Sequence, residues 1–349
     1  MRLGLTRREL VEVVVTAVLV GLACAVDLVH ANAVVRFAAA AVALAMLARL
    51  VGTATEQLGG RLGAGGAGSV QSALGNLPEL FVALFALHRG LVGVVKAALV
   101  GSVLANSLLV LGLAFVAGGL ENGVQQFHSQ RARTTASLLV LAAAILAIPT
   151  FAHRLQAPAA AHERTLSLIC AGVLIVVFLA TLRIFLAGEA SDLERPRWSL
   201  LTTVAVLTAA AAGAVFVSDW FVSALEPATS SLHMSDTFAG LVVVAIAGNA
   251  VENVVGVQLA LRNEADFSVS VIVNSALQVA LALTPVLVFA GLAFPTQLTL
   301  VFPTLLAVAL LLGAILGSVV VYDGESTWQE GTILIGLYAV IAASFWWGS

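Results

Sequence analysis

Two acidic side chains inside apolar stretches are the residues of this sequence best suited to chemistry. Glu79 ends the stretch Gly75-Asn76-Leu77-Pro78-Glu79, and Glu252 ends the stretch Gly248-Asn249-Ala250-Val251-Glu252. A charged side chain at the centre of a membrane-spanning helix costs about 2.5 to 3.5 kcal/mol on insertion scales, so a carboxylate there points to a function. In both stretches an Asn precedes the Glu by three residues, which places the two side chains on one face of a helix.

Further polar side chains follow each stretch on the next apolar segment. They are Ser102, Asn106, Ser275 and Gln278. Positions 76 and 249, 79 and 252, and 102 and 275 are each separated by 173 residues. Because one separation is shared across two consecutive segments, the sequence predicts a duplicated unit.

Two carboxylates surrounded by amide and hydroxyl oxygens would form a site without imidazole or thiolate ligands. Hard cations prefer such sites, and Ca²⁺ accepts about six to eight oxygen ligands in a flexible geometry. We therefore predict that Ca²⁺ or a similar divalent cation binds to Glu79, Glu252, Asn76, Asn249, Ser102, Asn106, Ser275 and Gln278.

The same two glutamates, Glu79 and Glu252, could couple cation movement to proton movement. Without a cation, burial and mutual repulsion favour the protonated carboxyl group, whereas a bound divalent ion favours the ionised one. Cation and protons would then compete for one site. If only a loaded or neutralised site can change its access from one side of the membrane to the other, the result is antiport.

The composition excludes a soluble globular protein. Of the 349 residues, 60% are hydrophobic and only 10% are charged, and the mean hydropathy is +1.06. Soluble chains carry about 25% charged residues. The formal net charge is −3 and no dense Lys/Arg cluster occurs, so the lipid bilayer is an expected partner and nucleic acid is not.

We predict an all-α polytopic membrane protein with eleven transmembrane helices. The apolar segments lie at 11–29, 33–55, 67–87, 91–118, 134–152, 165–187, 199–224, 236–261, 267–292, 297–321 and 331–347. Glycine-rich breaks at Gly59-Gly60-Arg61 and Gly118-Gly119 are typical of turns. Lys96, at the start of its segment, is expected to extend its ammonium group to the membrane interface.

The duplication predicts three parts of the chain. Residues 1–32 would form an N-terminal transmembrane helix, 33–190 a first five-helix repeat, and 191–349 a second one. Because five is an odd number, the two repeats would have opposite orientations in the membrane. Secondary transporters with inverted repeats bind their substrates near the midplane, between the repeats.

Basic residues predict the orientation of the chain. With a cytoplasmic N-terminus, ten Arg residues would lie at cytoplasmic ends and five basic residues on the opposite side, where the C-terminus would also lie. The predominance of Arg over Lys suggests a bacterial inner membrane. Glu56 and Glu226, near the ends of the first span of each repeat, could line an ion pathway, and a surface position is equally compatible with the sequence.

Several stretches resemble the two repeat signatures of the cation/proton exchanger family, within the sodium/calcium exchanger superfamily. They are GNLPELFVALFAL, GSVLANSLLVLGLAFVAGG, GNAVENVVGVQLAL and NSALQVAL, and ATEQLGGRLG and DGESTWQEG extend the similarity over most of the chain. The resemblance implies that Glu79 and Glu252 are the cation-binding glutamates. It implies that Asn76 and Asn249 are their amide partners and that the flanking polar ligands are Ser102, Asn106, Ser275 and Gln278. It also implies eleven spans.

The sequence departs from the family pattern at a few positions. Asn253 stands where a His commonly follows the second Glu, and Asn274 stands where a Gly commonly precedes the Ser. The acidic segment often found between the halves is reduced to Glu189, Asp192 and Glu194.

The sequence thus predicts a secondary antiporter that exchanges Ca²⁺ for H⁺, with no cofactor besides the transported ions and no enzymatic activity. An Na⁺/Ca²⁺ exchanger of the same fold is the nearest alternative. A passive cation channel or a structural scaffold is a further one, whereas an intramembrane hydrolase lacks a catalytic motif, because His162-Glu163 is not followed by a second His at the required spacing. Stoichiometry and oligomeric state stay open, and an oligomer is compatible with the sequence.

Overall fold

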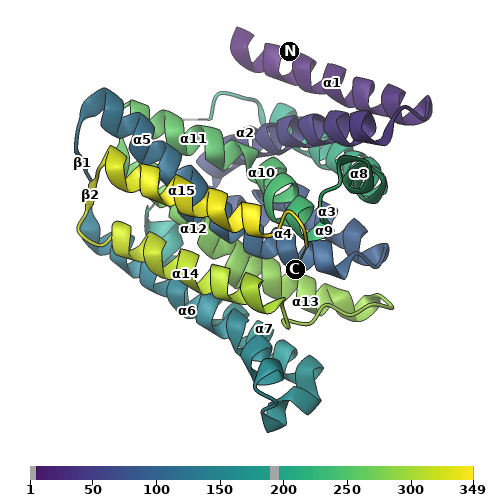
Figure 1. Cartoon of the computed structure of the whole chain (residues 1–349). Coiled ribbons are helices and arrows are strands. Elements are labelled where there is room, and N and C mark those ends of the chain that lie inside the picture. Colours follow the sequence, from purple (N-terminus) through teal and green to yellow (C-terminus); the bar gives the residue numbers. More distant parts are fainter. Residues whose placement is uncertain (1–4, 189–195, 349) are drawn as a thin grey trace. The chain divides into compact units, whose positions relative to one another are not determined.

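The computed structural model describes residues 5–188 and 196–348, which are almost entirely helical (Figure 1). A helix satisfies its own backbone hydrogen bonds, as a chain surrounded by hydrocarbon requires. The predicted boundary between the repeats, at residues 190 and 191, lies outside the described residues. The described chain divides into two compact units. The first holds 5–86, 179–188, 196–233 and 247–251, and the second holds 87–178, 234–246 and 252–348.

In the first unit, an antiparallel pair of helices leads the chain. α1 (Arg7–Leu28) and α2 (Ala33–Leu74) are joined at one end by an ion pair between Arg36 and Asp27. At the other end Arg49 Nε lies 2.8 Å from Glu12 Oε1. Because Arg36 pairs with Asp27 and the later Arg49 pairs with the earlier Glu12, the two helices are antiparallel. Figure 1 shows them side by side.

α8 (Leu200–Leu232) packs along α2 in the same unit. The rings of Phe37 and Phe221 stack with their centroids 4.7 Å apart. The Gln57 side-chain oxygen accepts hydrogen bonds from the backbone N–H groups of Arg197 (2.8 Å) and Trp198 (3.2 Å). These bonds fix the chain just before α8 to the middle of α2.

The predicted turn at Gly59-Gly60-Arg61 is wrong. α2 continues through it as a helix to Leu74, and the break comes at Gly75 and Asn76 instead. A glycine inside a helix costs only about 1 kcal/mol relative to alanine, so glycine alone does not end a helix. Pro78 then lies in the first turn of α3 (Leu77–His88), where its missing N–H has no helical partner to lose.

The second unit contains most of the remaining helices and three π-helical segments. In chain order they are α4 (Val92–Leu104), η1 (Ala105–Val110), α5 (Leu111–Asn122), β1 (Gln125–Gln126), α6 (Ser129–Arg154), η2 (Pro158–His162), α7 (Glu163–Gly188), α9 (Asp236–Phe238), η3 (Ala239–Val244), α10 (Ala245–Gly248), α11 (Ala250–Leu261), α12 (Ala265–Gln278), η4 (Val279–Leu283), α13 (Thr284–Ala290), η5 (Gly291–Ala293), α14 (Thr304–Val320), β2 (Glu325–Ser326) and α15 (Trp328–Ser344). The last part of α7 and the junction of α10 with α11 belong to the first unit.

Glycines let α5 and α15 pack backbone against backbone (Figure 1). A Cβ atom added to Gly331 would lie 2.8 Å from Val116 N and 2.9 Å from Phe115 Cβ. One added to Gly119 would lie 2.9 Å from Trp328 N. The predicted turn at Gly118-Gly119 is therefore wrong, because both residues lie inside α5: Gly119 allows the close approach of α15, and Gly118 leaves space for the Gln125 side chain.

β1, between α5 and α6, forms a short antiparallel pair with β2, between α14 and α15. Gln125 pairs with Ser326, and Gln126 pairs with Glu325. Phe127 N extends the pairing with a 2.8 Å hydrogen bond to Gly324 O. The loops that follow α5 and α14 are thereby held together.

An irregular segment, residues 294–303, links η5 to α14 and is packed into the second unit. Leu300 and Phe302 are buried. Leu300 N donates to Ser167 Oγ (2.9 Å), and Phe302 N donates to Thr150 Oγ1 (2.9 Å). Side chains of α6 and α7 therefore supply the partners that a helix would have supplied.

Lys96 also holds this segment, and the extension of its ammonium group to the membrane interface stays a prediction. Its Nζ donates to Val301 O at 2.6 Å and to Thr299 Oγ1 at 3.2 Å. The carbonyl of Val301 and the hydroxyl of Thr299 thereby satisfy two donors of the ammonium group.

The count of eleven spans stays a prediction. Among the described residues, seven helices are each long and apolar enough to cross a membrane, and the pair Asp236–Gly248 and Glu252–Leu261, bent by 62°, is an eighth candidate. α3 and α14 are apolar but shorter. The many apolar spans themselves agree with the predicted all-α polytopic membrane protein.

Replacing Gly331 by alanine tests the packing of α15 on α5. We expect Gly331→Ala to lower the free energy of unfolding by about 1 to 3 kcal/mol, because the added methyl group meets backbone atoms that cannot move aside. The measurement is thermal unfolding in detergent. Gly336→Ala on the same helix is the control, since nothing lies within 4 Å of its added Cβ. Equal melting temperatures for the two variants would contradict this packing.

Candidate cation site

The two acidic stretches lie at matching helix breaks. α3 and α11 each contain twelve residues, and their first and last positions are separated by 173 residues (77 to 250 and 88 to 261). The same separation relates the starts of α4 and α12 (92 to 265). Asn76 directly precedes α3 and Asn249 directly precedes α11, and both residues have a non-helical backbone. The repeat inferred from polar residues thus extends to the helix boundaries.

Glu79 is buried in the first unit and bound by an amide of the other repeat. Asn249 Nδ2 donates to Glu79 Oε1 at 2.6 Å. Glu79 is 8% exposed and Asn249 is 1% exposed. A short hydrogen bond to a buried carboxyl oxygen fixes the direction in which that oxygen points. The prediction from spacing that Asn76 and Glu79 share a face of one helix is wrong, because Asn76 lies in the break before α3, and spacing did not predict this bond between repeats.

Gly248 provides the space in which Glu79 lies. A Cβ atom added to Gly248 would lie 2.9 Å from Glu79 Oε1 and 3.1 Å from Glu79 Cδ, and closer still to Cγ. Any side chain at position 248 would therefore displace the carboxyl group from Asn249. The motif showed a glycine directly before Asn249. It could not show that this glycine contacts Glu79, because the contact joins different repeats.

A second bond between repeats lies in the second unit. Asn106 Nδ2 donates to Ser275 Oγ at 3.1 Å, and both residues are buried. Asn106 lies in the π-helix η1, whose wider turn is rare and is frequent at functional sites. Ser102, one turn earlier on α4, is 3% exposed. The structure thus brings predicted ligands of the two repeats into contact.

Three other predicted ligands are half-buried: Asn76, Glu252 and Gln278. Gln278 ends α12, where the π-helix η4 begins. Glu252 belongs to the second unit and Glu79 to the first, so their joint coordination of one cation stays a prediction.

The predicted pathway residues Glu56 and Glu226 are exposed on α2 and α8. Their exposure fits a pathway and a surface position equally well, so the role stays a prediction.

The donor set fits a hard cation. Within the described part of the chain, His, Cys, Asp and Glu form no group of three or more that could hold a metal ion. A cation bound here would depend on amide and hydroxyl oxygens together with the glutamates. Ca²⁺ accepts such mixed oxygen ligands.

Comparison with known proteins identifies the family. The family described as sodium/calcium exchanger protein matches residues 32–187 and 202–347. The chain belongs to this family. It is 34% identical over 335 residues to the Ca²⁺/H⁺ antiporter ChaA of Bacillus subtilis, covering 91% of this chain and 94% of the relative. It is also 34% identical over 337 residues to the Ca²⁺/H⁺ antiporter of Synechocystis sp., covering 88% and 90%.

Solved structures of exchangers share the fold. The structure of native YfkE matches with a TM-score of 0.83 at 32% identity and covers 96% of this chain and 99% of that chain. The H⁺/Ca²⁺ exchanger CAX matches with a TM-score of 0.77 at 14% identity, over 97% and 92%, which supports the fold alone. The family resemblance and the polytopic fold are confirmed, and the protein is an integral membrane protein.

A double-mutant cycle tests the contact of Gly248 with Glu79. Gly248→Ala is expected to destabilise the protein by about 1 to 2 kcal/mol when Glu79 is present, because two groups in direct contact are coupled. In a Glu79→Ala background the same change is expected to have no further effect, since the clashing atoms are gone. Melting temperatures in detergent give the coupling, and Gly172→Ala is the control because its added Cβ has open space. Additive effects of Gly248→Ala and Glu79→Ala would refute the contact.

Proposed function

We propose that this protein is a secondary antiporter that exchanges Ca²⁺, or a similar divalent cation, for H⁺ by alternating access. One observation carries the proposal: a buried carboxyl group, Glu79, is held in position by an amide of the opposite repeat. The antiporter names of the relatives from Bacillus subtilis and Synechocystis sp. support the same exchange.

In the proposed mechanism, Glu79 and Glu252 alternate between cation coordination and protonation. An ionised carboxyl group away from water is costly unless a positive charge compensates it. A divalent cation provides that charge in one half of the cycle, and protons neutralise the carboxyl groups in the other half. Asn249 can serve both states, because its amide group carries two N–H donors and one oxygen acceptor.

The remaining predicted ligands complete an oxygen coordination shell in this proposal. They are Asn76, Asn249, Ser102, Asn106, Ser275 and Gln278. No resident cofactor is required, and the cation is the transported substrate. The activity is transport rather than catalysis.

The proposed location is a bacterial inner membrane, with the N-terminus in the cytoplasm and the C-terminus on the opposite side. The distribution of Arg residues supports this orientation.

Neutralising either glutamate tests the proposal. Glu79→Gln and Glu252→Gln are each expected to reduce Ca²⁺ uptake into pH-gradient-loaded vesicles to background, because a glutamine keeps the shape but neither ionises nor exchanges a proton. Glu121→Gln, on the exposed end of α5, is the matched control and is expected to transport at the wild-type rate. Full exchange by either site variant would rule out the proposed role of that glutamate.

The Na⁺/Ca²⁺ alternative makes an opposite prediction about the driving ion. An imposed pH gradient in sodium-free vesicles is expected to drive Ca²⁺ uptake, and a sodium gradient at equal pH on both sides is expected not to. Uptake is followed with a Ca²⁺-sensitive dye. Uptake that needs Na⁺ would replace the proton by Na⁺ as counter-ion, and electrogenic Ca²⁺ flux with neither gradient would favour a channel.

A further inference from the structure

Four polar side chains recur at every fourth position along α12. They are Asp266, Ser270, Asn274 and Gln278. Four residues advance a helix by slightly more than one turn, so successive members are displaced by about 40° and all four occupy one side of the helix. This polar stripe extends over about 18 Å at 1.5 Å per residue. It begins in the first turn of α12 and ends at a predicted cation ligand.

The polar stripe lies on the more accessible side of α12. All four of its members are half-buried, whereas Ser268, Ile272 and Ala276 on other sides of the helix are fully buried. Polar side chains that face hydrocarbon lose their hydrogen bonds with water and are costly. A partly accessible polar stripe along a membrane-spanning helix is therefore explained by water rather than by lipid.

Contacts connect the polar stripe to its two ends. Asn274 Nδ2 donates to Ser270 Oγ at 3.2 Å, which joins the two central members. Beyond them, Gln278 lies one turn further along the same side, and Ser275, which is bonded to Asn106, is its neighbour on α12. The polar stripe thus reaches the part of the candidate site that lies in the second unit.

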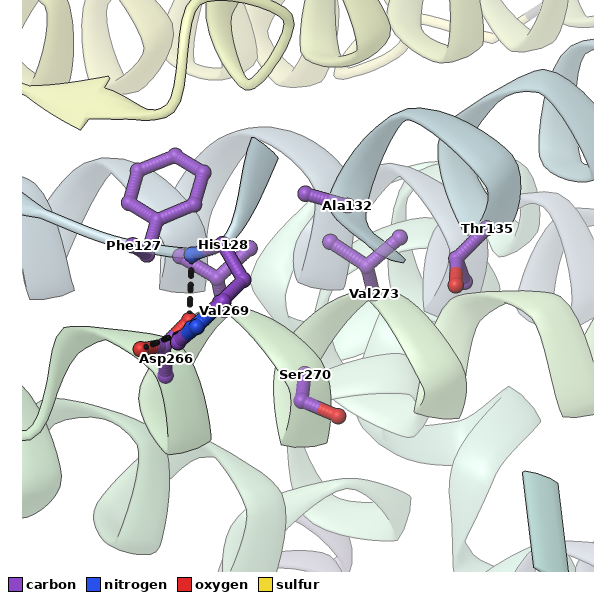
Figure 2. Close-up of a pocket in the computed structure, with 8 residues that line it drawn as sticks. All are labelled: Phe127, His128, Ala132, Thr135, Asp266, Val269, Ser270 and Val273. Atoms are coloured by element: carbon purple, nitrogen blue, oxygen red, sulfur yellow. Dashed lines mark hydrogen bonds and ion pairs between the residues drawn. The ribbon is translucent and has the colours of Figure 1, made fainter. Parts of the chain in front are cut away.

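A small pocket marks the other end of the polar stripe. Figure 2 shows Asp266 and Ser270 among its lining residues, together with Thr135 of α6 and His128 in the loop before α6. His128 Nδ1 lies 2.8 Å from Asp266 Oδ2, and the His128 backbone N–H also donates to Asp266. Asp266 therefore places a carboxylate, paired with the exposed His128, beside Ser270 at a pocket whose other lining residues include apolar side chains of α6 and α12.

The corresponding helix of the first repeat has no such stripe. The positions that match Ser270, Asn274 and Gln278 at the 173-residue separation are Ala97 and Gly101 of α4 and Ala105 at the start of η1. All three are buried, and a Cβ added to Gly101 would lie 2.7 Å from Leu241 Cα. The polar stripe of α12 thus has no counterpart at the matching positions of the first repeat.

We propose that Asp266, Ser270, Asn274 and Gln278 line a hydrated access route, by which the transported cation reaches the candidate site from the side of the membrane that bears His128 and Asp266. The route rests on the proposed antiport only for the identity of the ion. Its residues differ from Glu56 and Glu226, the pathway candidates of the sequence analysis.

Cysteine accessibility tests the route without requiring transport. In a Cys24→Ala/Cys170→Ala background, Ser270→Cys and Asn274→Cys are treated with a positively charged, membrane-impermeant methanethiosulfonate reagent in vesicles of both orientations. Glu264→Cys, in the exposed turn before α12, identifies the side of the membrane. We expect both stripe cysteines to react from the same side as Glu264→Cys.

Two controls separate water from lipid and from helix opening. Val176→Cys lies on α7, where Val176 is 66% exposed among apolar neighbours, and Ile272→Cys lies on the buried side of α12. Because the thiolate in water is the reactive form, the stripe cysteines are expected to react at least about tenfold faster than either control. Absence of labelling, labelling only from the opposite side, or equal rates at the controls would overturn the route.

A transport measurement adds a second test. Ser270→Ala/Asn274→Ala is expected to raise the KM for Ca²⁺ presented on the Glu264 side at least about threefold, with the KM on the other side and the melting temperature unchanged, because only hydration of the route is lost. An unchanged KM on the Glu264 side would overturn the route.

Labelled stripe cysteines in vesicles that move no Ca²⁺ would uphold the route and refute the antiport. Normal exchange with unlabelled stripe cysteines would overturn the route and uphold the antiport.

Discussion

The structure depends on one constraint, which is that polar groups in a chain surrounded by hydrocarbon must find their partners within the protein. Helices meet it for most of the backbone. Where the chain leaves the helix, side chains replace the missing partners, as Thr150, Ser167 and Lys96 do for residues 294–303. The same constraint accounts for the two bonds between repeats, in which a buried amide donates to a buried carboxyl group (Asn249 to Glu79) or to a buried hydroxyl group (Asn106 to Ser275).

The bond of Asn249 to Glu79 shows how the constraint also serves function. A structural polar contact would need only a donor and an acceptor of fixed charge. Glu79 instead offers a group whose charge can change, and it lies against Gly248, where no side chain limits its position. A carboxyl group that is both held and able to change its charge is suited to exchanging one positive ion for another.

Residue pattern alone predicted the helical fold, the duplicated unit and the motifs at the breaks before α3 and α11. These depend on local composition and on a fixed separation, both of which a sequence displays. Pattern failed at Gly59-Gly60 and at Gly118-Gly119, since a glycine that ends a helix and a glycine that admits a neighbouring helix look the same in one dimension. It also missed the partners of Glu79, Asn106 and Lys96. Those contacts join segments more than 150 residues apart, and their geometry follows from tertiary packing.

The close packing of α5 on α15 has a consequence for biosynthesis. The partners of Gly112 and Gly119 on α5 are Gly331 and Trp328 on α15, and β1 pairs with β2, so these contacts join residues 112–126 to residues 325–331. Chains emerge from the ribosome with the N-terminal part first. The α5 surface around Gly112 and Gly119 therefore stays without its α15 partner until translation is almost complete.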